Sequence, residues 1–494
     1  MATFLIGMAI LIVGGFFYGK YCEKVFGPDD RQTPAVSKAD GIDFVEMKTW
    51  KNSLVNLLNI AGTGPILGPI QGILFGPIAF ITIPVGCILA GSMHDYFVGM
   101  ISMREGGAQL PRMIEKYLGK KIHKIYNVIA WLLLVLVGVV FIYTPGDLIV
   151  KEIIGQDASA SNPTMWIVYG CIFAYYLIAT LFPIDAIIGR VYPIFGAILI
   201  LSAVGVLIGV FMDGGESLNN LSLANITAQN LTKTPFIPTF FITVACGIMS
   251  GFHGTQVTLI SRTVTTEKDG KTTFFNMMLA EGFIAMVWAA GAMVLFNRGQ
   301  AVNTNATLMI GLISREFLGT IGAVFAILGV IVLPITSGDT AFRGLRLMIA
   351  EQFNIDQTNK IKRIAVTLVI FIPAVFILVF AKLNPSGFNT LWKYFAWTNQ
   401  TVAIFALALV TIYLHMRGKN YWLALIPGMF YTFIISSYIL HAPIGFGLES
   451  RLGMDPTSYL LSYIIAAVLT LLYGFGTLKV AKNDKDKILS TNLN

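Results

Sequence analysis

The sequence predicts an all-α polytopic membrane protein whose core is an inverted repeat of five plus five transmembrane helices. The first observation is composition: 55% of the 494 residues are hydrophobic, only 12% are charged, and the mean hydropathy is +0.73. A soluble domain carries about 25% charged residues. The second is a series of apolar runs of about 20 residues, the length that spans a bilayer as a helix. The third is a pair of glycine-rich interruptions, at 60–70 and 245–254.

About thirteen apolar segments long enough to approach or cross a bilayer follow one another, separated by short polar loops. The first lacks a basic n-region and a cleavage site, so we expect it to be a retained helix and not a signal peptide. The expected segments are, in order, 2–20, 53–75, 77–102, 124–143, 165–183, 192–212, 235–260, 273–296, 317–340, 364–381, 394–416, 421–440 and 458–478.

The basic residues predict the orientation of these segments, because Lys and Arg accumulate in cytoplasmic loops. With the N-terminus outside and the C-terminus in the cytoplasm, most of the 34 basic residues fall in cytoplasmic stretches. The outer loops then hold only Lys151, Lys233, Arg298, Arg315, Lys382, Lys393 and Arg451. We therefore predict a multi-pass protein of a prokaryotic cytoplasmic membrane. The net charge of +8 faces the anionic inner leaflet, so it does not indicate a nucleic-acid partner.

The two glycine-rich interruptions predict the domain organisation. In the expected topology the segment 53–75 runs outwards and the segment 235–260 runs inwards, so two interrupted helices cross in opposite directions. This placement predicts a first repeat over 53–212 and an inverted second repeat over 235–416. Residues 1–52 would add an N-terminal helix and a cytoplasmic loop, and residues 417–494 two further helices and a tail.

Interrupted helices have a physical use in a membrane. Lipid offers no hydrogen-bond partners, so irregular backbone survives only where it is buried in protein or lines a wet cavity. There, free N–H groups and helix N-termini can hold a carboxylate, and free carbonyls a cation. The alternative is that the glycines only allow close helix packing. The candidate substrate-binding residues at the two interruptions are Gly62, Thr63, Gly64, Gly68, Ser250, Gly251, His253 and Gly254.

Four motifs carry a resemblance to a known family. They read "IAGTGPILGPI" (60–70), "ACGIMSGFH" (245–253), "GDTAFRGLR" (338–346) and "NTLWKYFAWTNQ" (389–400). In this order, over roughly 40–430, the chain resembles the carbon starvation protein A family. The resemblance implies a secondary transporter of the amino acid–polyamine–organocation superfamily with a leucine-transporter-like core. It also implies a starvation-response protein that takes up peptides or, as in a related branch, pyruvate with protons. Val55 and Asn56 stand where the long members carry paired histidines.

Polar residues within the apolar segments are the other candidates, because ionisable groups in a membrane are costly and usually functional. Asp95 matches an acidic position of the family, and it or His253 could carry protons or hold a gate. The hydroxyl pair Thr336 and Ser337 resembles the sodium site of transporters with this core. Further candidates are a gating ion pair between Asp339 and Arg343 and two ligand-binding amides, Asn399 and Gln400. Glu281 also lies inside an apolar segment, and its spacing names no partner.

The sequence indicates transport and not catalysis. It has no P-loop, no dinucleotide-binding turn and no HExxH motif. We expect no cofactor apart from a coupling ion, either H⁺ or Na⁺, and the sequence leaves the oligomeric state open. The leading hypothesis is an ion-coupled importer of small carboxylate-bearing solutes, either short peptides or pyruvate-like acids. The alternative is a ligand-gated channel or a substrate-sensing receptor that uses the same interruptions.

Three expectations follow for the interruptions. Both glycine runs should be non-helical at mid-membrane depth. The coupling ion should be sodium at Thr336 and Ser337, or a proton that uses Asp95 or His253. The substrate carboxylate should lie on the backbone N–H groups of residues 62–64 or 250–254, because glycines let a ligand approach the backbone closely.

Overall fold

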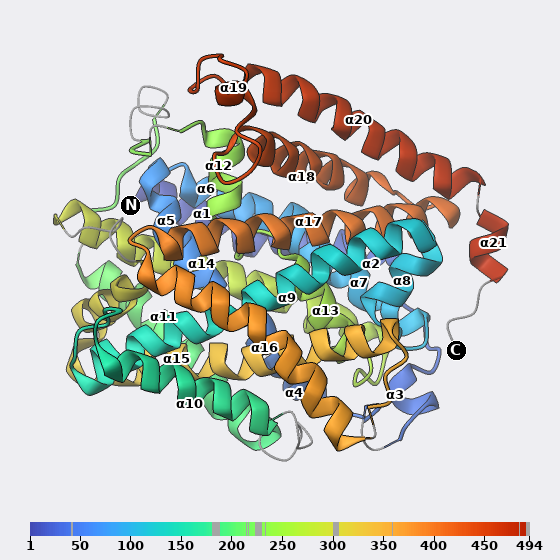
Figure 1. The fold of residues 1–494 in the computed structure, drawn as a ribbon. Helices are drawn as coiled ribbons and strands as arrows, with labels where there is room; N and C mark the ends of the chain where they lie inside the picture. Colours follow the sequence, from blue (N-terminus) through green and yellow to red (C-terminus); the bar gives the residue numbers. More distant parts are fainter. Residues whose placement is uncertain are drawn as a thin grey trace.

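The computed structural model describes residues 1–40, 43–179, 188–213, 215, 217–222, 230–232, 234–299, 306–357, 359–483 and 485–490. These residues form a bundle of α-helices joined by short connections (Figure 1). The helices are α1 (Ala2–Ala9), α2 (Gly15–Phe26), α3 (Pro34–Ser37), α4 (Thr49–Ile60), α5 (Gly64–Gly72), α6 (Ala79–Gly86), α7 (Met93–Arg104), α8 (Leu110–Leu118), α9 (Lys120–Leu148), α10 (Pro163–Ala179), α11 (Ile188–Met212), α12 (Phe236–Thr243), α13 (Gly251–Ile260), α14 (Asn276–Asn297), α15 (Ala306–Gln352), α16 (Lys360–Leu383), α17 (Gly387–Met416), α18 (Trp422–His441), α19 (Leu448–Arg451), α20 (Leu460–Asn483) and α21 (Lys485–Ser490).

The number of spans is smaller than the sequence predicts. In the described residues, 10 helices are long and apolar enough to cross a membrane, or 11 if the bent pair α4 and α5 counts as one span. Two of the thirteen expected segments do not reach that length. The segment 235–260 forms two short helices, α12 and α13, on either side of its glycine run. In the segment 165–183 the described residues belong to α10, a helix of 17 residues, and residues 180–183 lie outside the described part.

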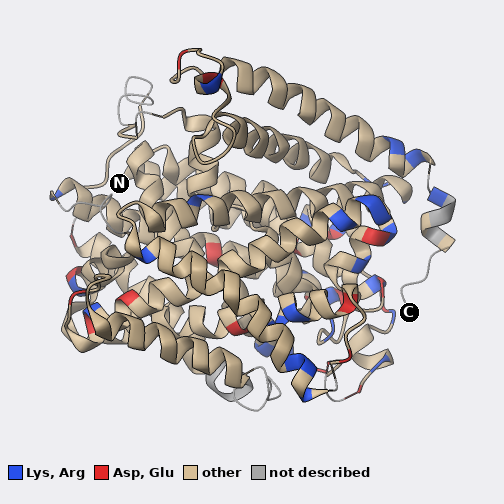
Figure 2. Ribbon diagram, in the orientation of Figure 1, with Lys and Arg blue, Asp and Glu red and all other residues tan. Residues whose placement is uncertain are grey.

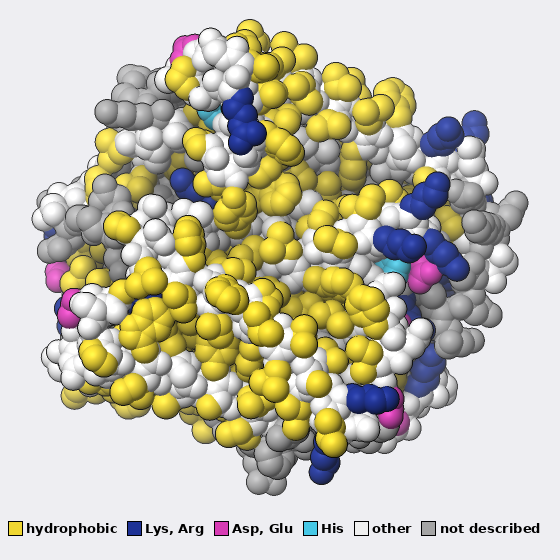
Figure 3. Space-filling view, viewed as in Figure 1, with side chains coloured by type: hydrophobic (Ala, Val, Ile, Leu, Met, Phe, Trp, Pro, Cys, Tyr) yellow, Lys and Arg dark blue, Asp and Glu magenta, His cyan; other side chains and the backbone are white. Residues whose placement is uncertain are grey.

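Burial separates a central layer of helices from a lipid-facing layer. In α17, 89% of the most apolar stretch is buried by other helices, whereas in α20 the share is 22%. Figure 1 shows α20 at the periphery and α17 across the middle of the bundle. Figure 3 shows a face covered by hydrophobic side chains, which is the surface that a bilayer accepts. The polar residues discussed below lie on or between the central helices.

Several helical stretches were not expected from the sequence, and α8 and the start of α15 are two of them. Helix α8 has an apolar face on an otherwise polar segment. The helical spacing brings its buried residues to this face, and they include Leu110, Met113, Ile114 and Tyr117. The start of α15 is also helical where a loop was expected. A break at Gly319, with φ of +64° and ψ of −175°, divides α15 into two helices. The segment of α8 is too polar to be predicted as a span, and the start of α15, from Ala306 to the break at Gly319, is too short.

The N-terminal span Ala2–Phe26, which contains α1 and α2, contacts the core through Arg104 at one end of the bundle. Arg104, at the end of α7, donates from Nε and Nη2 to the Glu267 carboxylate at 2.8 Å each, and from Nη2 to the Gly27 carbonyl at 2.8 Å. Its guanidinium also lies 4.1 Å from the centre of the Phe26 ring. Figure 2 shows Lys and Arg gathered at this same end, where α3, α8 and the start of α16 lie.

Candidate functional site

The first interruption lies between α4 and α5, whose axes bend by 53°. The helical part of the glycine run is longer than expected: only Ala61, Gly62 and Thr63 leave the helix, which resumes at Gly64. Pro65 lies in the first turn of α5, where its missing N–H is not needed. Thr63 is fully buried, and its hydroxyl has no hydrogen-bond partner among the described residues. An unpartnered buried hydroxyl at a helix start is a candidate ligand-binding group.

The second interruption is wider and runs over 244–250, between α12 and α13. Gly247 has a φ of +87°, a left-handed conformation that favours glycine. Its N–H donates to Glu281 Oε1 of α14 at 3.1 Å. The expected break is therefore present at both glycine runs, and a carboxylate from a neighbouring helix accepts a hydrogen bond from the backbone of the second one.

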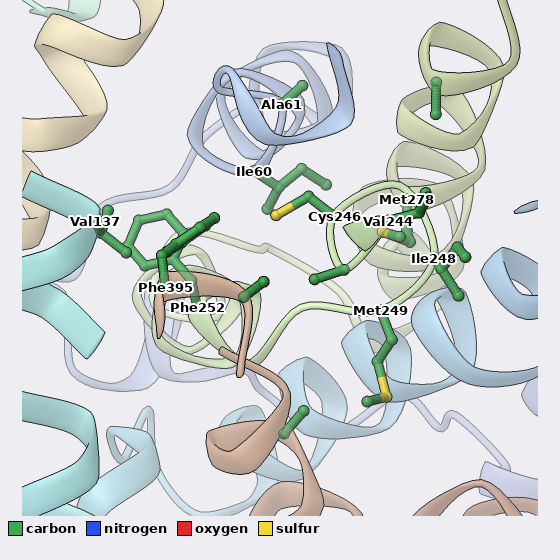
Figure 4. Close-up of a cluster of buried hydrophobic side chains, with 14 of the residues drawn as sticks. Ile60, Ala61, Val137, Val244, Cys246, Ile248, Met249, Phe252, Met278 and Phe395 are labelled. Atoms are coloured by element: carbon green, nitrogen blue, oxygen red, sulfur yellow. The ribbon is translucent and has the colours of Figure 1, made fainter. Parts of the chain in front are cut away.

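The two interruptions contact each other. A Cβ on Gly64 would lie 2.5 Å from both Cβ and Sγ of Cys246. Figure 4 shows side chains of both breaks, among them Ala61 and Cys246, in one cluster of buried hydrophobic groups with Phe252 of α13. At the start of α13, a Cβ on Gly251 would lie 2.2 Å from the carbonyl oxygen of Asn399. Packing therefore requires glycine at both positions, whether or not a ligand also binds there.

The polar residues of α17 support the second interruption. Asn399 Oδ1 accepts hydrogen bonds from the Ser250 hydroxyl at 3.1 Å and from the Phe252 N–H at 2.9 Å. It thereby satisfies an N–H group in the first turn of α13, as a capping side chain does. Gln400 Nε2 donates to the Phe241 carbonyl of α12, and its Oε1 has no partner among the described residues. Both amides are fully buried.

Four ionisable side chains meet beside the second interruption. His94 Nδ1 lies 2.8 Å from Asp95 Oδ1, and Asp95 Oδ2 lies 3.0 Å from His253 Nδ1. On its other side, His253 Nε2 lies 3.3 Å from Glu281 Oε2, although this contact falls outside hydrogen-bonding geometry. None of the four is more than 1% exposed. Helices α7, α13 and α14 thus share one buried chain of acid and imidazole groups, which we call the acid–imidazole chain.

The charge of His253 determines how many hydrogen bonds it can donate within the acid–imidazole chain. Protonated imidazole has two N–H donors, one for each neighbouring carboxylate, whereas neutral imidazole has only one. Loss of its proton would therefore leave one of two buried carboxylates without a donor from His253. Glu281 also accepts a hydrogen bond from the Gly247 N–H, so one carboxylate contacts both His253 and the backbone of the second interruption.

The two hydroxyls of the predicted sodium site point in different directions. Ser337 is fully buried, and its Oγ lies 3.5 Å from the Leu58 carbonyl near the end of α4. Thr336 instead donates to the carbonyl of Leu333 in its own helix. Only Ser337 therefore faces the first broken helix. In the described residues, no group of three or more His, Cys, Asp or Glu has metal-holding geometry, a search that does not cover carbonyl and hydroxyl ligands.

Asp339 and Arg343 form the expected ion pair, with Nη2 and Oδ2 3.3 Å apart on one face of α15. The pair lies beside a cavity of about 810 Å³ between α8, α13 and α15, which we call the vestibule. Arg343 lines it on one side and Gln256 of α13 on the other. Because Gln256 follows His253 by three residues, the inner end of the vestibule lies about one helical turn from the acid–imidazole chain.

Sequence reasoning missed the partners of the buried charges. Glu281 was a candidate without a partner, and the structure provides His253 and the Gly247 N–H. A second buried pair joins α9 to α16: Lys382 Nζ lies 2.6 Å from Asp147 Oδ1, and the Tyr169 hydroxyl donates to the same oxygen at 2.8 Å. In the sequence, each of the two apolar segments shows only one charged residue near its C-terminal end, Asp147 in one and Lys382 in the other.

Comparison with known proteins places the whole arrangement among membrane transporters. The profile of the family described as "Carbon starvation protein CstA" matches residues 1–144, 139–311 and 300–437. An uncharacterized membrane protein of Haemophilus influenzae is 38% identical over 345 residues, 61% of this chain and 93% of that protein. The "Peptide transporter CstA" of Campylobacter jejuni is 25% identical over 87% of this chain and 78% of that protein.

A further relative is the "Pyruvate/proton symporter BtsT" of Escherichia coli, 24% identical over 58% of this chain and 48% of that protein. Solved structures share the fold at lower identity. A manganese transporter of Eremococcus coleocola aligns with a TM-score of 0.55 at 13% identity, covering 91% of this chain and 99% of that one. MhsT in complex with L-phenylalanine aligns with a TM-score of 0.53 at 13% identity, covering 87% and 99%. The fold is therefore the leucine-transporter-like fold that the resemblance implied.

Proposed function

The chain belongs to the carbon starvation protein CstA family, and on that premise we propose that it imports small carboxylate-bearing solutes by ion-coupled alternating access. The family is one of secondary transporters, and the expectation that the chain is not an enzyme is confirmed. The proposed solutes are short peptides or pyruvate-like acids, since the named relatives are a peptide transporter and a pyruvate/proton symporter.

The observation that carries the proposal is the acid–imidazole chain. Ionisable groups buried between membrane helices are costly and typically mark proton or substrate pathways. Here His253 lies between Asp95 and Glu281, and Glu281 holds the irregular backbone at Gly247. A proton that arrives on His253 therefore changes the hydrogen bonding of the very segment that moves in this fold. We propose H⁺ as the coupling ion on this ground.

The solute is proposed to bind at the two interruptions through its carboxylate. Thr63 offers a buried hydroxyl without a partner, and α5 and α13 both begin at the interruptions. A helix N-terminus contributes about 0.3–1 kcal/mol to anion binding, and each hydrogen bond to a charged group roughly 1.5–3 kcal/mol. A few such contacts reach the range of about 4–8 kcal/mol that corresponds to millimolar to micromolar affinity.

Alternating access is proposed to follow the predicted five-plus-five repeat, 53–212 and 235–416. The moving bundle would contain α4 to α7 and α12 to α14, which carry both interruptions and the acid–imidazole chain. We place the N-terminus outside and the C-terminus inside a prokaryotic cytoplasmic membrane, because the basic residues gather at one end of the bundle (Figure 2). In this orientation the vestibule opens to the cytoplasm.

Sodium coupling is the second candidate, and the position of Ser337 Oγ, 3.5 Å from the Leu58 carbonyl of the first broken helix, favours it. The site would use one hydroxyl of the predicted pair, because Thr336 bonds within its own helix. A channel or receptor that uses the same interruptions is the remaining alternative. A channel passes solute downhill and shows no saturable counterflow.

Uptake into proteoliposomes with separately imposed H⁺ and Na⁺ gradients tests these proposals. Pyruvate and a panel of dipeptides serve as solutes, and counterflow is measured without any gradient. We expect saturable counterflow of at least one solute and accumulation driven by H⁺, which His253→Gln abolishes. Accumulation driven by Na⁺, lost in Ser337→Ala and kept in Thr336→Ala, would replace the proton proposal. Absence of counterflow for every solute would exclude the proposed transport.

A further inference from the structure

The vestibule has more positive than negative charge in its wall. Two of its basic residues are neutralised at the rim: Arg112 lies 2.6 Å from Glu351, and Arg262 lies 3.9 Å from Asp43. On α15, Arg343 pairs with the Asp339 carboxylate at 3.3 Å. The second basic residue of α15 that lines the vestibule is Arg346.

Arg346 is a buried guanidinium that forms no ion pair within the part of the chain that the structure describes. The residue is only 5% exposed. Its Nη1 donates to the neutral side chain of Gln357, and its Nε has no partner. Among the described residues, no carboxylate lies within ion-pairing distance of it. Arg343 and Arg363 act on it by repulsion, and Asp339 by attraction. A buried charge needs a counter-charge, so this site favours an anion.

The surroundings leave room for such an anion. Gly344 lies between the two arginines in the sequence, and nothing lies within 4 Å of the position that a Cβ would take there. The Nε of Arg343 is a second buried donor that has no hydrogen-bond partner among the described residues. The vestibule holds about 810 Å³, which is ample for a small organic acid.

We propose that Arg346 and Arg343 bind the carboxylate of a transported solute in the vestibule, at a site separate from the interruptions. The proposal rests on the proposed function for the identity of the solute. A guanidinium offers parallel N–H donors that match the two oxygens of a carboxylate. The solute would occupy this site between the broken helices and the cytoplasm, about one turn of α13 beyond His253.

Protection of an engineered thiol from alkylation tests the site directly. Leu347 lines the vestibule next to Arg346 and is 37% exposed, so Leu347→Cys places a thiol there. The background carries Cys171→Ser, because Cys171 is exposed whereas the other three cysteines are buried. The purified protein is labelled with a polar maleimide in the presence of pyruvate, glycylglycine or inorganic phosphate, and uptake is measured in parallel.

We expect pyruvate or glycylglycine to slow labelling at least threefold, and Arg346→Gln to raise the protecting concentration at least tenfold. Arg112→Gln, which removes the same charge from the rim, should leave protection unchanged. If Arg346→Gln does not purify as monodisperse protein, Arg346→Lys keeps the charge, loses the planar fork and should weaken protection in the same direction.

Three outcomes would overturn the inference. These are absence of protection in the parent protein, equal protection in Arg346→Gln, and stronger protection by phosphate than by either carboxylate. The proposed function fails separately. If the parent protein transports no carboxylate but Arg346 is needed for protection, the vestibule site stands and the transport proposal falls. If uptake proceeds without protection, the vestibule site falls and transport stands.

Discussion

Glu281→Gln should separate solute movement from proton coupling. The amide keeps an oxygen that can accept from the Gly247 N–H, now bonded to Glu281 at 3.1 Å. It removes the charge that lies 3.3 Å from His253 and so resembles the protonated carboxyl permanently. The protein should therefore fold and exchange solute, but it should no longer release and rebind a proton at this position during the cycle.

The size of the effect follows from the number of proton sites. One imidazole, His253, lies between two carboxylates, so we expect one proton per cycle. One pH unit is worth about 1.4 kcal/mol, which supports roughly tenfold accumulation of a monoanion carried with one proton. A zwitterionic peptide has no net charge, so its transport with one proton moves one positive charge, and a potential of 100 mV would add about 2.3 kcal/mol, roughly fiftyfold. Glu281→Gln should reduce accumulation to about onefold in either case.

The assay compares accumulation and counterflow in the same proteoliposomes. Parent protein and Glu281→Gln are given a gradient of one pH unit, with and without an imposed potential, and internal solute is measured at steady state. Counterflow without a gradient reports whether the variant still binds and moves solute. Glu281→Ala is the matched control for packing, because it leaves the Gly247 N–H buried and unpaired at a cost of about 1–3 kcal/mol.

The reasoning is refuted if Glu281→Gln accumulates solute as the parent protein does. That result would show that the proton does not act through Glu281, and that its contact with Gly247 serves folding alone. Loss of both counterflow and accumulation in a folded Glu281→Gln protein would also contradict the prediction, since the amide would then impair solute movement itself.

Three further predictions concern stability, measured as the apparent melting temperature in detergent. Lys382→Met should destabilise by about 3–5 kcal/mol because it leaves Asp147 buried and unpaired, and adding Asp147→Asn should restore most of the loss; equal melting of the single and double variants would contradict this. Gly251→Ala should cost about 1–3 kcal/mol through its collision with the α17 backbone, whereas Gly170→Ala, which meets open space, should cost nothing; similar melting of both variants would count against the collision. Glu267→Gln should lower stability by about 1–3 kcal/mol through loss of its charged hydrogen bonds, and the loss should shrink if Arg104 is already neutralised by substitution.

The sequence determined the class of protein, most of its helices and the places where two of them break. These features have local causes. Apolar runs of a given length form helices in a bilayer, and glycine and proline interrupt them wherever they cluster. The breaks at 61–63 and 244–250 overlap the runs that the sequence singled out, although each helix resumes earlier than the glycine content suggests. The amphipathic helix α8 escaped prediction because it is too polar to be a span.

Only the tertiary structure decided which polar groups act together. Asp95 and His253 are 158 residues apart, and Asp147 and Lys382 are 235 residues apart, yet each pair is in contact. The sequence identifies Asp95, His253 and Glu281 as residues that are costly to place in a membrane. It does not show that they contact one another in the acid–imidazole chain. It did not indicate that Arg346 forms no ion pair among the described residues, because that depends on the positions of Gln357 and Asp339 in space. The free-energy cost of burying a charge depends on its neighbours in space. Helix packing determines those neighbours, and they can be far apart in the sequence.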